Sequence, residues 1–445
     1  MSKLGKEDIL RIADEQNIQF LRLQFSDVRG NLKSFEVPRS RFEMALEQTA
    51  FDGSTVEGFT RVEESDMFLS PDYDSFAVFP WYSPLGEGKV ARVLCDVYDT
   101  DEMAFIGDPR YILKRALRKA ENMGYDFKVC LECEFFLFDE NGDGQPSTVT
   151  GDTGGYFDMG PVDRGEECRR EICSILEEMN IKVSASHHAS APAQHQINLV
   201  ADDALRMADN FLTLKYVVKS IAQQHGLVAT FMPKPVYGIN GSGLHINMSL
   251  FRGIKNIFSD ESDKEFLSQT AYRFIAGLMK HAKDMTLVLN PLVNSYRRLV
   301  PGFEAPVHIA WSGKNRSALV RIPASRGPDD TRVELRSPDG ACNPYLGLAV
   351  CLLAGLDGIE NELEPPQVTN VNVFKMGRRQ SDRVDIETLP TTMGDAIELY
   401  ENSRFLKQCL GEHVFNQYMY SKKREINAYR SGISSWEIDN YLLKC

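Results

Sequence analysis

The sequence predicts an α+β protein of two domains, in which a smaller, mainly β part precedes a larger part that mixes strands with helices. The first hundred residues contain strand-like runs separated by turns, whereas beyond residue 105 apolar residues recur at helical spacing between further strands. A chain of 445 residues, 43% of them hydrophobic, can fill two or three domains of ~150 residues each. We therefore place the domains at residues 1–105 and 106–445.

In the N-terminal part, we expect strands at 20–25, 34–37, 75–79 and 91–97. Asp108 and Pro109 then indicate the start of a helix, because Asp caps free N–H groups and Pro fits the first helical position. In the larger part, the expected helices are 165–180, 204–224, 265–285, 344–364 and 393–410. The expected strands there are 129–138, 194–200, 243–251, 307–311 and 332–337.

Composition excludes several classes of function. There are 50 Lys and Arg against 63 Asp and Glu, a formal net charge of −13, and a basic block that would follow a nucleic-acid backbone is missing from the sequence. No apolar run reaches the ~20 residues of a membrane span, and the charged first residues do not resemble a signal peptide. Nine cysteines without framework spacing favour reduced thiols and a cytoplasmic location.

Paired polar residues recur in otherwise apolar strands. Glu132 and Glu134 share one face of an expected strand, and buried carboxylates are costly unless a cation or hydrogen-bond donors neutralise them. Three more strands have such a pair, namely His245 with Asn247, Glu334 with Arg336, and Gln196 with Asn198. A solvated strand face or a hydrogen-bonded core histidine would explain any one pair alone. Four pairs together predict a polar funnel on a curved sheet that holds a divalent cation with oxygen ligands.

Arginines gather in one stretch of the chain. They are Arg297, Arg298, Arg316, Arg321, Arg326, Arg332 and Arg336. In an acidic protein this cluster favours an anionic small molecule, because guanidinium groups suit carboxylate and phosphate, although surface ion pairs are the alternative. A cation site beside arginines suits phosphoryl transfer.

Several motifs point to a known family. They are FDGS at 51–54, FMPKP at 231–235, NGSG at 240–243, the segments 294–306 and 315–323, and NPY at 343–345. Together they resemble the type I glutamine synthetases of bacteria, in the shorter form of Gram-positive species, over essentially the whole chain. The resemblance implies an N-terminal β-grasp domain and a C-terminal catalytic domain of the glutamine synthetase and guanido kinase type, with a curved antiparallel sheet flanked by helices.

The resemblance also implies a reaction and an assembly. The reaction is ATP-dependent ligation of glutamate and ammonia through γ-glutamyl phosphate, as in glutamine biosynthesis, with Mg²⁺ or Mn²⁺ as cofactor. The assembly is a homo-oligomer, a dodecamer of two hexameric rings, in which the N-terminal domain of one subunit completes the site of the next.

Single residues match functional positions of that family. The metal ligands implied for the nucleotide-side ion are Glu132, His245 and Glu334, and the one for the second ion is Glu134. The implied substrate-binding residues are Asn240, Gly241, Arg298, Arg336 and Tyr156. Those implied for the nucleotide are Asn247, Ser249 and Arg321. The implied catalytic residues are Asp52, which helps deprotonate ammonium, Glu304, which closes the site, and Arg316, which contacts phosphate. Arg61 lies where the family's glutamine-feedback contacts occur.

One segment departs from the family pattern. Where the family has HHE-x-APGQHEID, residues 187–198 are HHASAPAQHQIN, so that Ala189 and Gln196 replace two carboxylate ligands of the second metal. We therefore expect glutamine formation to be impaired, or a different amine or acid to be used. The alternative is a weak or inactive homologue, a pseudoenzyme that binds nucleotide or glutamine as a regulatory or co-assembling subunit. A phosphagen-kinase-like phosphotransferase is a remoter possibility.

Overall fold

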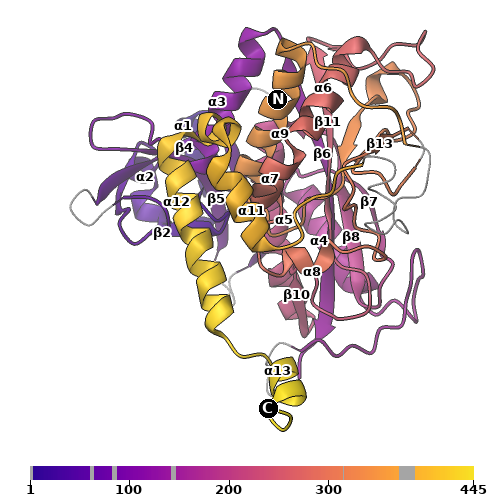
Figure 1. Ribbon diagram of the computed structural model, residues 1–445. Helices are drawn as coiled ribbons and strands as arrows, with labels where there is room; N and C mark the ends of the chain where they lie inside the picture. Colours follow the sequence, from indigo (N-terminus) through magenta and orange to yellow (C-terminus); the bar gives the residue numbers. More distant parts are fainter. Residues whose placement is uncertain (1–3, 61–64, 83–87, 142–146, 314, 370–385) are drawn as a thin grey trace.

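The computed structural model describes residues 4–60, 65–82, 88–141, 147–313, 315–369 and 386–445, and these form two sheets with helices around them (Figure 1). The smaller sheet has five strands in the order β2-β1-β5-β4-β3. The larger has ten, with the path β13-β14-β15-β11-β6-β8-β7 and the short strands β9, β10 and β12 paired at its sides. Each sheet has its own cluster of buried apolar side chains.

The N-terminal sheet places β1 beside β5 in parallel, and its other pairs are antiparallel. One side of α1 packs on it, with Ile9 and Ala13 buried. The elements of this part are α1 (Lys6–Glu15), β1 (Ile18–Ser26), β2 (Leu32–Pro38), α2 (Phe42–Ala45), β3 (Thr49–Asp52), β4 (Asp66–Tyr82) and β5 (Lys89–Tyr98). The four strands expected here are confirmed.

The large sheet is antiparallel except where β13 runs parallel to β14. Its strands are β6 (Asp126–Asp139), β7 (Val183–His188), β8 (Gln194–Leu199), β9 (Asp202–Asp203), β10 (Leu227–Thr230), β11 (Leu244–Arg252), β12 (Lys255–Asn256), β13 (Trp311–Ser312), β14 (Val320–Arg321) and β15 (Val333–Leu335). The strand expected at 307–311 is wrong, because only Trp311 and Ser312 pair in this region as a named strand, while His308 forms an isolated bridge to Thr388.

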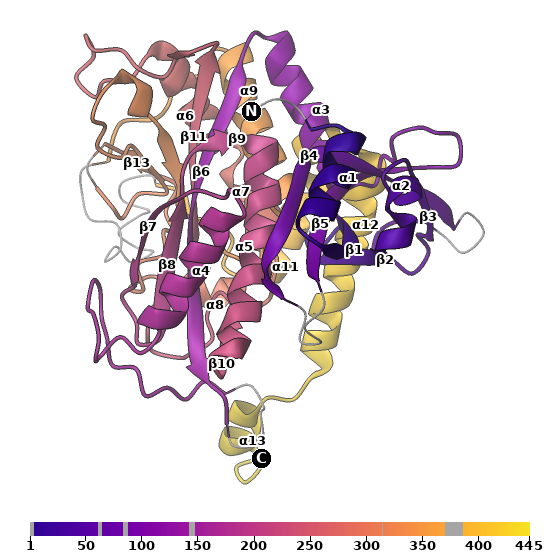
Figure 2. The same ribbon diagram turned by 180° about the vertical axis from the view of Figure 1, so that it is seen from behind.

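Helices lie against one side of the large sheet and between it and the smaller sheet (Figures 1 and 2). They are α3 (Pro109–Asn122), α4 (Glu166–Glu178), α5 (Ala204–Gln224), α6 (Gln269–Lys280), α7 (Ala282–Leu289), α8 (Ser295–Arg298), α9 (Pro344–Glu360), α11 (Met393–Asn402), α12 (Arg404–Ser431) and α13 (Ser435–Tyr441). The most apolar is α9, which is buried on most of its circumference between α3, α5 and α6.

Helix starts follow the capping residues seen in the sequence. Asp108 accepts a hydrogen bond from the N–H of Arg110 at the start of α3, and Asn343 caps α9 before Pro344. The single helix expected at 265–285 is wrong. It is α6 and α7, because Ser268 caps a later start and the chain leaves helical geometry at His281.

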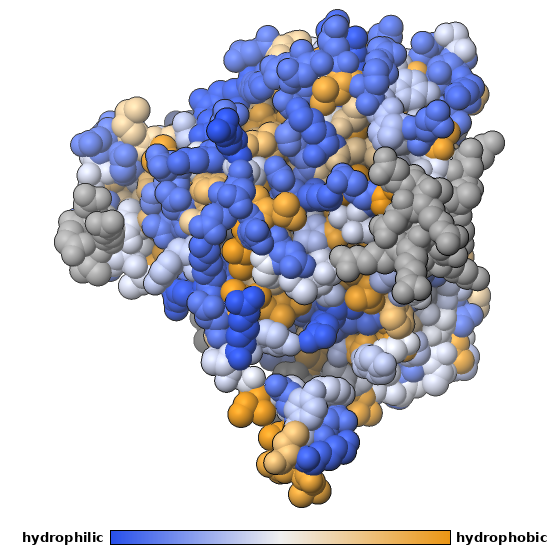
Figure 3. Space-filling view, viewed as in Figure 1, coloured by the Kyte–Doolittle hydropathy of each residue, from blue (hydrophilic) through white to orange (hydrophobic). Residues whose placement is uncertain are grey.

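The helix expected at 393–410 is also two helices. Ser403 has an extended backbone, ends α11 and caps α12 through its side chain, which accepts from the N–H of Leu406. None of the helices in the described ranges is long and apolar enough to cross a membrane. Apolar side chains are exposed at and beside α13 near the C-terminus, where Figure 3 shows them gathered, and they include Trp436, Tyr441 and Leu443.

Candidate active site

Four neighbouring strands bring the predicted polar pairs together. In the order β15-β11-β6-β8, Asn247 lies opposite Glu334, His245 opposite Glu132, and Gln196 opposite Glu134. Because side chains alternate between the two faces of a strand, these residues all lie on the same face of the sheet. The polar funnel expected from the period-two spacing is therefore present.

Glu132, His245 and Glu334 form a group suited to a divalent cation. One ligand atom from each lies within 4.8 Å of the others, and His245 Nδ1 is 3.4 Å from both a Glu132 and a Glu334 oxygen. Two carboxylates and an imidazole are a donor set that Mg²⁺ or Mn²⁺ accepts when phosphate and water complete it. Burial would raise the pKa of Glu132, but hydrogen bonds from His245 and Asn247 and the charge of Arg332 outweigh it and hold this pKa at about 2.

Two arginines lie on the buried end of this group. Glu334 is only 1% exposed, and it accepts from Arg321 Nη1 at 2.9 Å and from Arg336 Nε at 3.1 Å. Asn247 donates to Glu132 at 3.0 Å and accepts from Arg332 at 3.3 Å. The site therefore combines carboxylates for a cation with guanidinium groups for an anion, which is the combination that phosphate chemistry uses.

The region around Glu134 differs from the first group. One oxygen of Glu134 accepts from Gly243 N–H at 2.6 Å and from Gln194 Nε2 at 3.4 Å. The Gln196 amide donates to Asn198 at 2.8 Å and points toward Glu132 at 3.5 Å, while the methyl group of Ala189 is buried. Amide groups thus lie here beside a single carboxylate.

The glutamate-binding positions expected from the resemblance lie at the edge of the funnel. Arg298 is 3% exposed and donates to the backbone oxygens of Ser337 and Arg336. Asn240 donates to Glu304 at 3.0 Å, and Glu304 has a left-handed backbone with φ 58°. Gly241 has no room for a side chain, because a Cβ there would lie 2.2 Å from the carbonyl oxygen of Pro233.

Four of the expected site residues do not contact the funnel residues described above within one chain. Asp52 ends β3, which lies on the opposite side of the molecule from β7 and β8 (Figure 2), and its carboxylate accepts from Ser54. Tyr156 is 51% exposed and stacks on Phe157. Arg316 is exposed, and Ser249 lies further along β11. Arg61 falls outside the described residues.

Sequence reasoning missed two residues of the site, Gln194 and Ser190, and named Arg332 only as a member of the arginine cluster. Gln194 contacts Glu134 and the carbonyl oxygen of Gly241, Ser190 donates to Glu304 at 3.3 Å, and Arg332 contacts Asn247. Gln194 had a detectable signal, because it lies two residues before Gln196 and must share its face. Ser190 had none, since only the fold brings the β7–β8 turn to Glu304.

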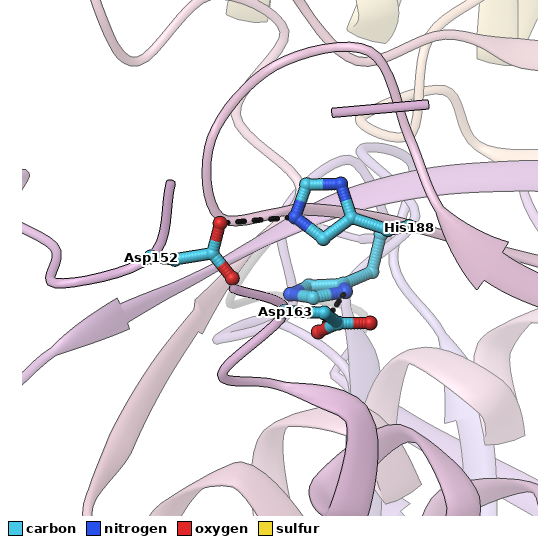
Figure 4. Close-up of side chains that lie close together, drawn as sticks. Asp152, Asp163 and His188 are labelled. Carbon is cyan, nitrogen blue, oxygen red and sulfur yellow. Dashed lines mark hydrogen bonds and ion pairs between the residues drawn. The ribbon is translucent and has the colours of Figure 1, made fainter. Parts of the chain in front are cut away.

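A second cluster lies on the other face of β8. Figure 4 shows His188 with Asp152 and Asp163, and His195 belongs to the same buried group. His188 Nε2 is 3.0 Å from Asp152. Arg169 Nη1 lies 2.9 Å from Asp163 and 2.8 Å from His195 Nδ1. The cluster therefore contains its own fixed cation, and we interpret it as a structural ion-pair network that attaches the segment after β6 to β7 and β8.

The two histidines of this cluster have pKa values shifted in opposite directions, although burial acts to lower both. Burial and the adjacent charge of Arg169 lower the pKa of His195 far below its usual value, so this imidazole is neutral. Burial also acts to lower the pKa of His188, but the Asp152 carboxylate and the carbonyl oxygen of Ala189 outweigh it and raise this pKa. His188 therefore donates to two acceptors as part of the packing behind the funnel.

Comparisons with known proteins agree with this geometry. Residues 17–100 match the family model of the glutamine synthetase beta-Grasp domain, and residues 106–441 match that of the glutamine synthetase catalytic domain. A glutamine synthetase of Staphylococcus aureus is 51% identical to this chain, and the match covers 98% of each protein. One of Clostridium saccharobutylicum is also 51% identical, and the match covers the full length of each. Among solved structures, a GmaS/ADP complex has a TM-score of 0.88 at 33% identity over 98% of this chain and 99% of its own. The structure of Plasmodium falciparum glutamine synthetase has a TM-score of 0.87 at 25% identity, and the match covers 99% of each chain.

Proposed function

The chain belongs to the glutamine synthetase family, and on that premise we propose that it ligates glutamate with ammonia or another amine, using ATP, at a reduced rate. The intermediate is γ-glutamyl phosphate, as the family's chemistry implies. The observation that carries the proposal is the difference between the two parts of the funnel. The Glu132 group is complete, whereas the Glu134 region has amides and a methyl group in place of carboxylates.

The Glu132, His245 and Glu334 side chains would hold Mg²⁺ or Mn²⁺. When bound, such an ion neutralises charge on the nucleotide phosphates. Arg321 and Arg336, which already contact Glu334, are positioned to stabilise negative charge beside it. We place the nucleotide along β11, at Asn247 and Ser249, and the glutamate near Asn240, Gly241 and Arg298.

The reduced rate follows from the second region. Removing one electrostatic element from a transition state typically costs on the order of 10²–10³ in rate. Glu134 alone offers a carboxylate there, and its charge is partly satisfied by the N–H of Gly243. We therefore expect ATP to bind with one divalent ion per site and phosphoryl transfer to glutamate to be slow.

A second candidate function is a regulatory or co-assembling subunit without turnover. The observation that favours it is that Gln194 and Gly243 both donate hydrogen bonds to the same oxygen of Glu134. Titration calorimetry with Mg-ATP and then glutamate, combined with phosphate release in ammonium, separates the two. A slow ligase releases phosphate only when glutamate is present. Binding of both ligands with no phosphate release would refute the ligase and support the regulatory subunit.

Further proposals concern the assembly. We propose a domain division at residues 105 and 106, a cytoplasmic location and a dodecamer of two hexameric rings. Asp52 and Tyr156 would then act at sites shared between subunits, which would account for the distance of β3 from the funnel within one chain. Light scattering of the purified protein tests the dodecamer, and a monomer in the presence of Mg-ATP would contradict it.

A further inference from the structure

Lys234 is a buried lysine beside the funnel that has no acidic partner. It is only 8% exposed, and no carboxylate of the described residues lies within ion-pair distance of its ammonium group. Burial, and then the charge of Arg298, lowers the pKa of Lys234. Because a buried charge is costly when nothing compensates it, groups other than carboxylates have to stabilise this ammonium.

The first such group belongs to residues 239–243, which we call the Asn240 loop. Lys234 Nζ donates a hydrogen bond to the carbonyl oxygen of Ile239, the first residue of this loop. The loop is also tied to the residue before Lys234, since the N–H of Ser242 donates to the carbonyl oxygen of Pro233 at 2.8 Å. Lys234 therefore helps to fix the loop that carries two of the residues we propose for glutamate.

The second group belongs to residues 299–306, which we call the Glu304 segment. Lys234 Nζ lies 3.6 Å from the centre of the Phe303 ring, and the face of an aromatic ring attracts a cation. Phe303 is half-buried, and in the described part of the chain it packs in none of the clusters of buried apolar side chains. Because Glu304 also accepts from Asn240 at 3.0 Å, the segment and the loop are joined at two neighbouring residues.

The main chain of Lys234 is fixed separately by Asn294. Asn294 Oδ1 accepts from the N–H of Lys234 at 2.7 Å, and its Nδ2 donates to the carbonyl oxygen of Lys234 at 3.0 Å. An amide side chain that donates and accepts in this way uses both of its polar groups on one residue. Asn294 directly precedes α8, which ends at Arg298, where the Glu304 segment begins. The side chain of Lys234 thus extends from a fixed backbone to both neighbouring segments.

We propose that Lys234 is a positioning residue that holds the Glu304 segment against the Asn240 loop, with its ammonium group between Phe303 and Ile239. Both segments carry residues that we propose for glutamate, so loss of this contact should weaken glutamate binding in particular. The effect on glutamate rests on the proposed ligase function, whereas the coupling of the two segments does not.

Phe303→Leu tests the contact from the Glu304 segment, because it removes the ring and keeps an apolar side chain. Calorimetry on the full chain with glutamate, in the presence of Mg-ADP, should show ~2- to 30-fold weaker binding, the range expected of a cation–π contact. Mg-ADP binding should change less than ~2-fold, because we place the nucleotide along β11. Phe303→Tyr is the conservative variant, which keeps the ring and should recover most of the lost affinity for glutamate.

Lys234→Met removes the cation from the other side of the same contact. Combined with Phe303→Leu, it should weaken glutamate binding no more than Lys234→Met does alone, because both changes remove one shared interaction. Additive losses in the double variant would overturn the proposal. Equal losses of glutamate and Mg-ADP binding would also overturn it, since they would show a general effect on the fold.

Hydrogen exchange of the ligand-free protein separates this coupling from the ligase proposal. In Lys234→Met, the backbone amides of both the Asn240 loop and the Glu304 segment should exchange faster. Faster exchange in only one of them, or in neither, overturns the coupling. If Lys234→Met does not fold, Phe303→Leu decides, because unchanged exchange in its Glu304 segment overturns the coupling. If the unaltered protein binds no glutamate while exchange rises as stated, the ligase proposal fails and the coupling stands.

Discussion

The double variant Ala189→Glu/Gln196→Glu places two more carboxylates beside Glu134. Gln196 is the direct cross-strand neighbour of Glu134, and Ala189 pairs through its N–H with the backbone of Gln194, whose side chain contacts Glu134. Both positions are buried or nearly so, at 2% and 8% exposed. We expect the variant to create a second cation site and to raise the rate of ligation.

The size of the effect follows from the charges. Two carboxylates ~4 Å apart repel by ~4 kcal/mol at an effective dielectric constant of 20, so the metal-free variant should be less stable than the unaltered protein. A divalent ion removes this repulsion, and the free energy of unfolding should therefore depend on metal much more strongly in the variant. If the second ion supplies one electrostatic element of the transition state, turnover should rise by ~10²–10³.

Three measurements test this. Titration with Mn²⁺ followed by electron paramagnetic resonance should give one ion per site before the change and two after it. Hydroxamate formation from glutamate, ATP and hydroxylamine reports turnover. Ala189→Gln is the matched control, because it adds the same bulk without charge and should gain nothing. Two bound ions with near-normal turnover in the unaltered protein, or no gain in the double variant despite a second ion, would refute the reasoning.

Other predictions concern single residues. Burial and then the charge of Asp96 raise the pKa of Asp108 to about 7, so between pH 5 and 7 the folded chain holds a proton that the unfolded chain has lost, and this residue's contribution to stability falls as pH rises. Asp108→Asn should make the fall in the free energy of unfolding between pH 5 and 7 smaller by ~2 kcal/mol, as measured by urea unfolding at both pH values. A fall as large as in the unaltered protein would contradict the raised pKa of Asp108. Arg169→Met should cost ~3–5 kcal/mol, because it leaves Asp163 buried without its cation, and a loss below ~1 kcal/mol in the same measurement would show that the pair contributes little. Glu334→Gln should weaken Mn²⁺ binding by at least ~100-fold, and an unchanged titration would exclude Glu334 as a ligand.

The local part of this site was predictable from the sequence, and the long-range part was not. The pairs Glu132/Glu134 and His245/Asn247 follow from strand alternation, which depends on neighbouring residues alone. The order of the four strands depends on pairings between distant parts of the chain, such as Glu134 with Gln196 and His245 with Glu132. The contact of Ser190 with Glu304 likewise had no local signal.

The same limit applies to the helices. The start of α9 could be predicted because a capping residue, Asn343, directly precedes a proline suited to the first helical position, Pro344. The break at Ser403 was not, because the apolar periodicity continues through it and only capping geometry ends the helix.

The two faces of β8 explain how this chain tolerates neutral residues at a charged centre. Residues 194, 196 and 198 point toward the funnel, while His195 on the reverse side joins the Arg169 network. Acids can therefore be exchanged for amides on the inner surface without disturbing the internal counterion that secures the outer one. Substitutions on the funnel side of β8 can therefore change the charge of the site, while the ion pairs on its other side keep the strand in place.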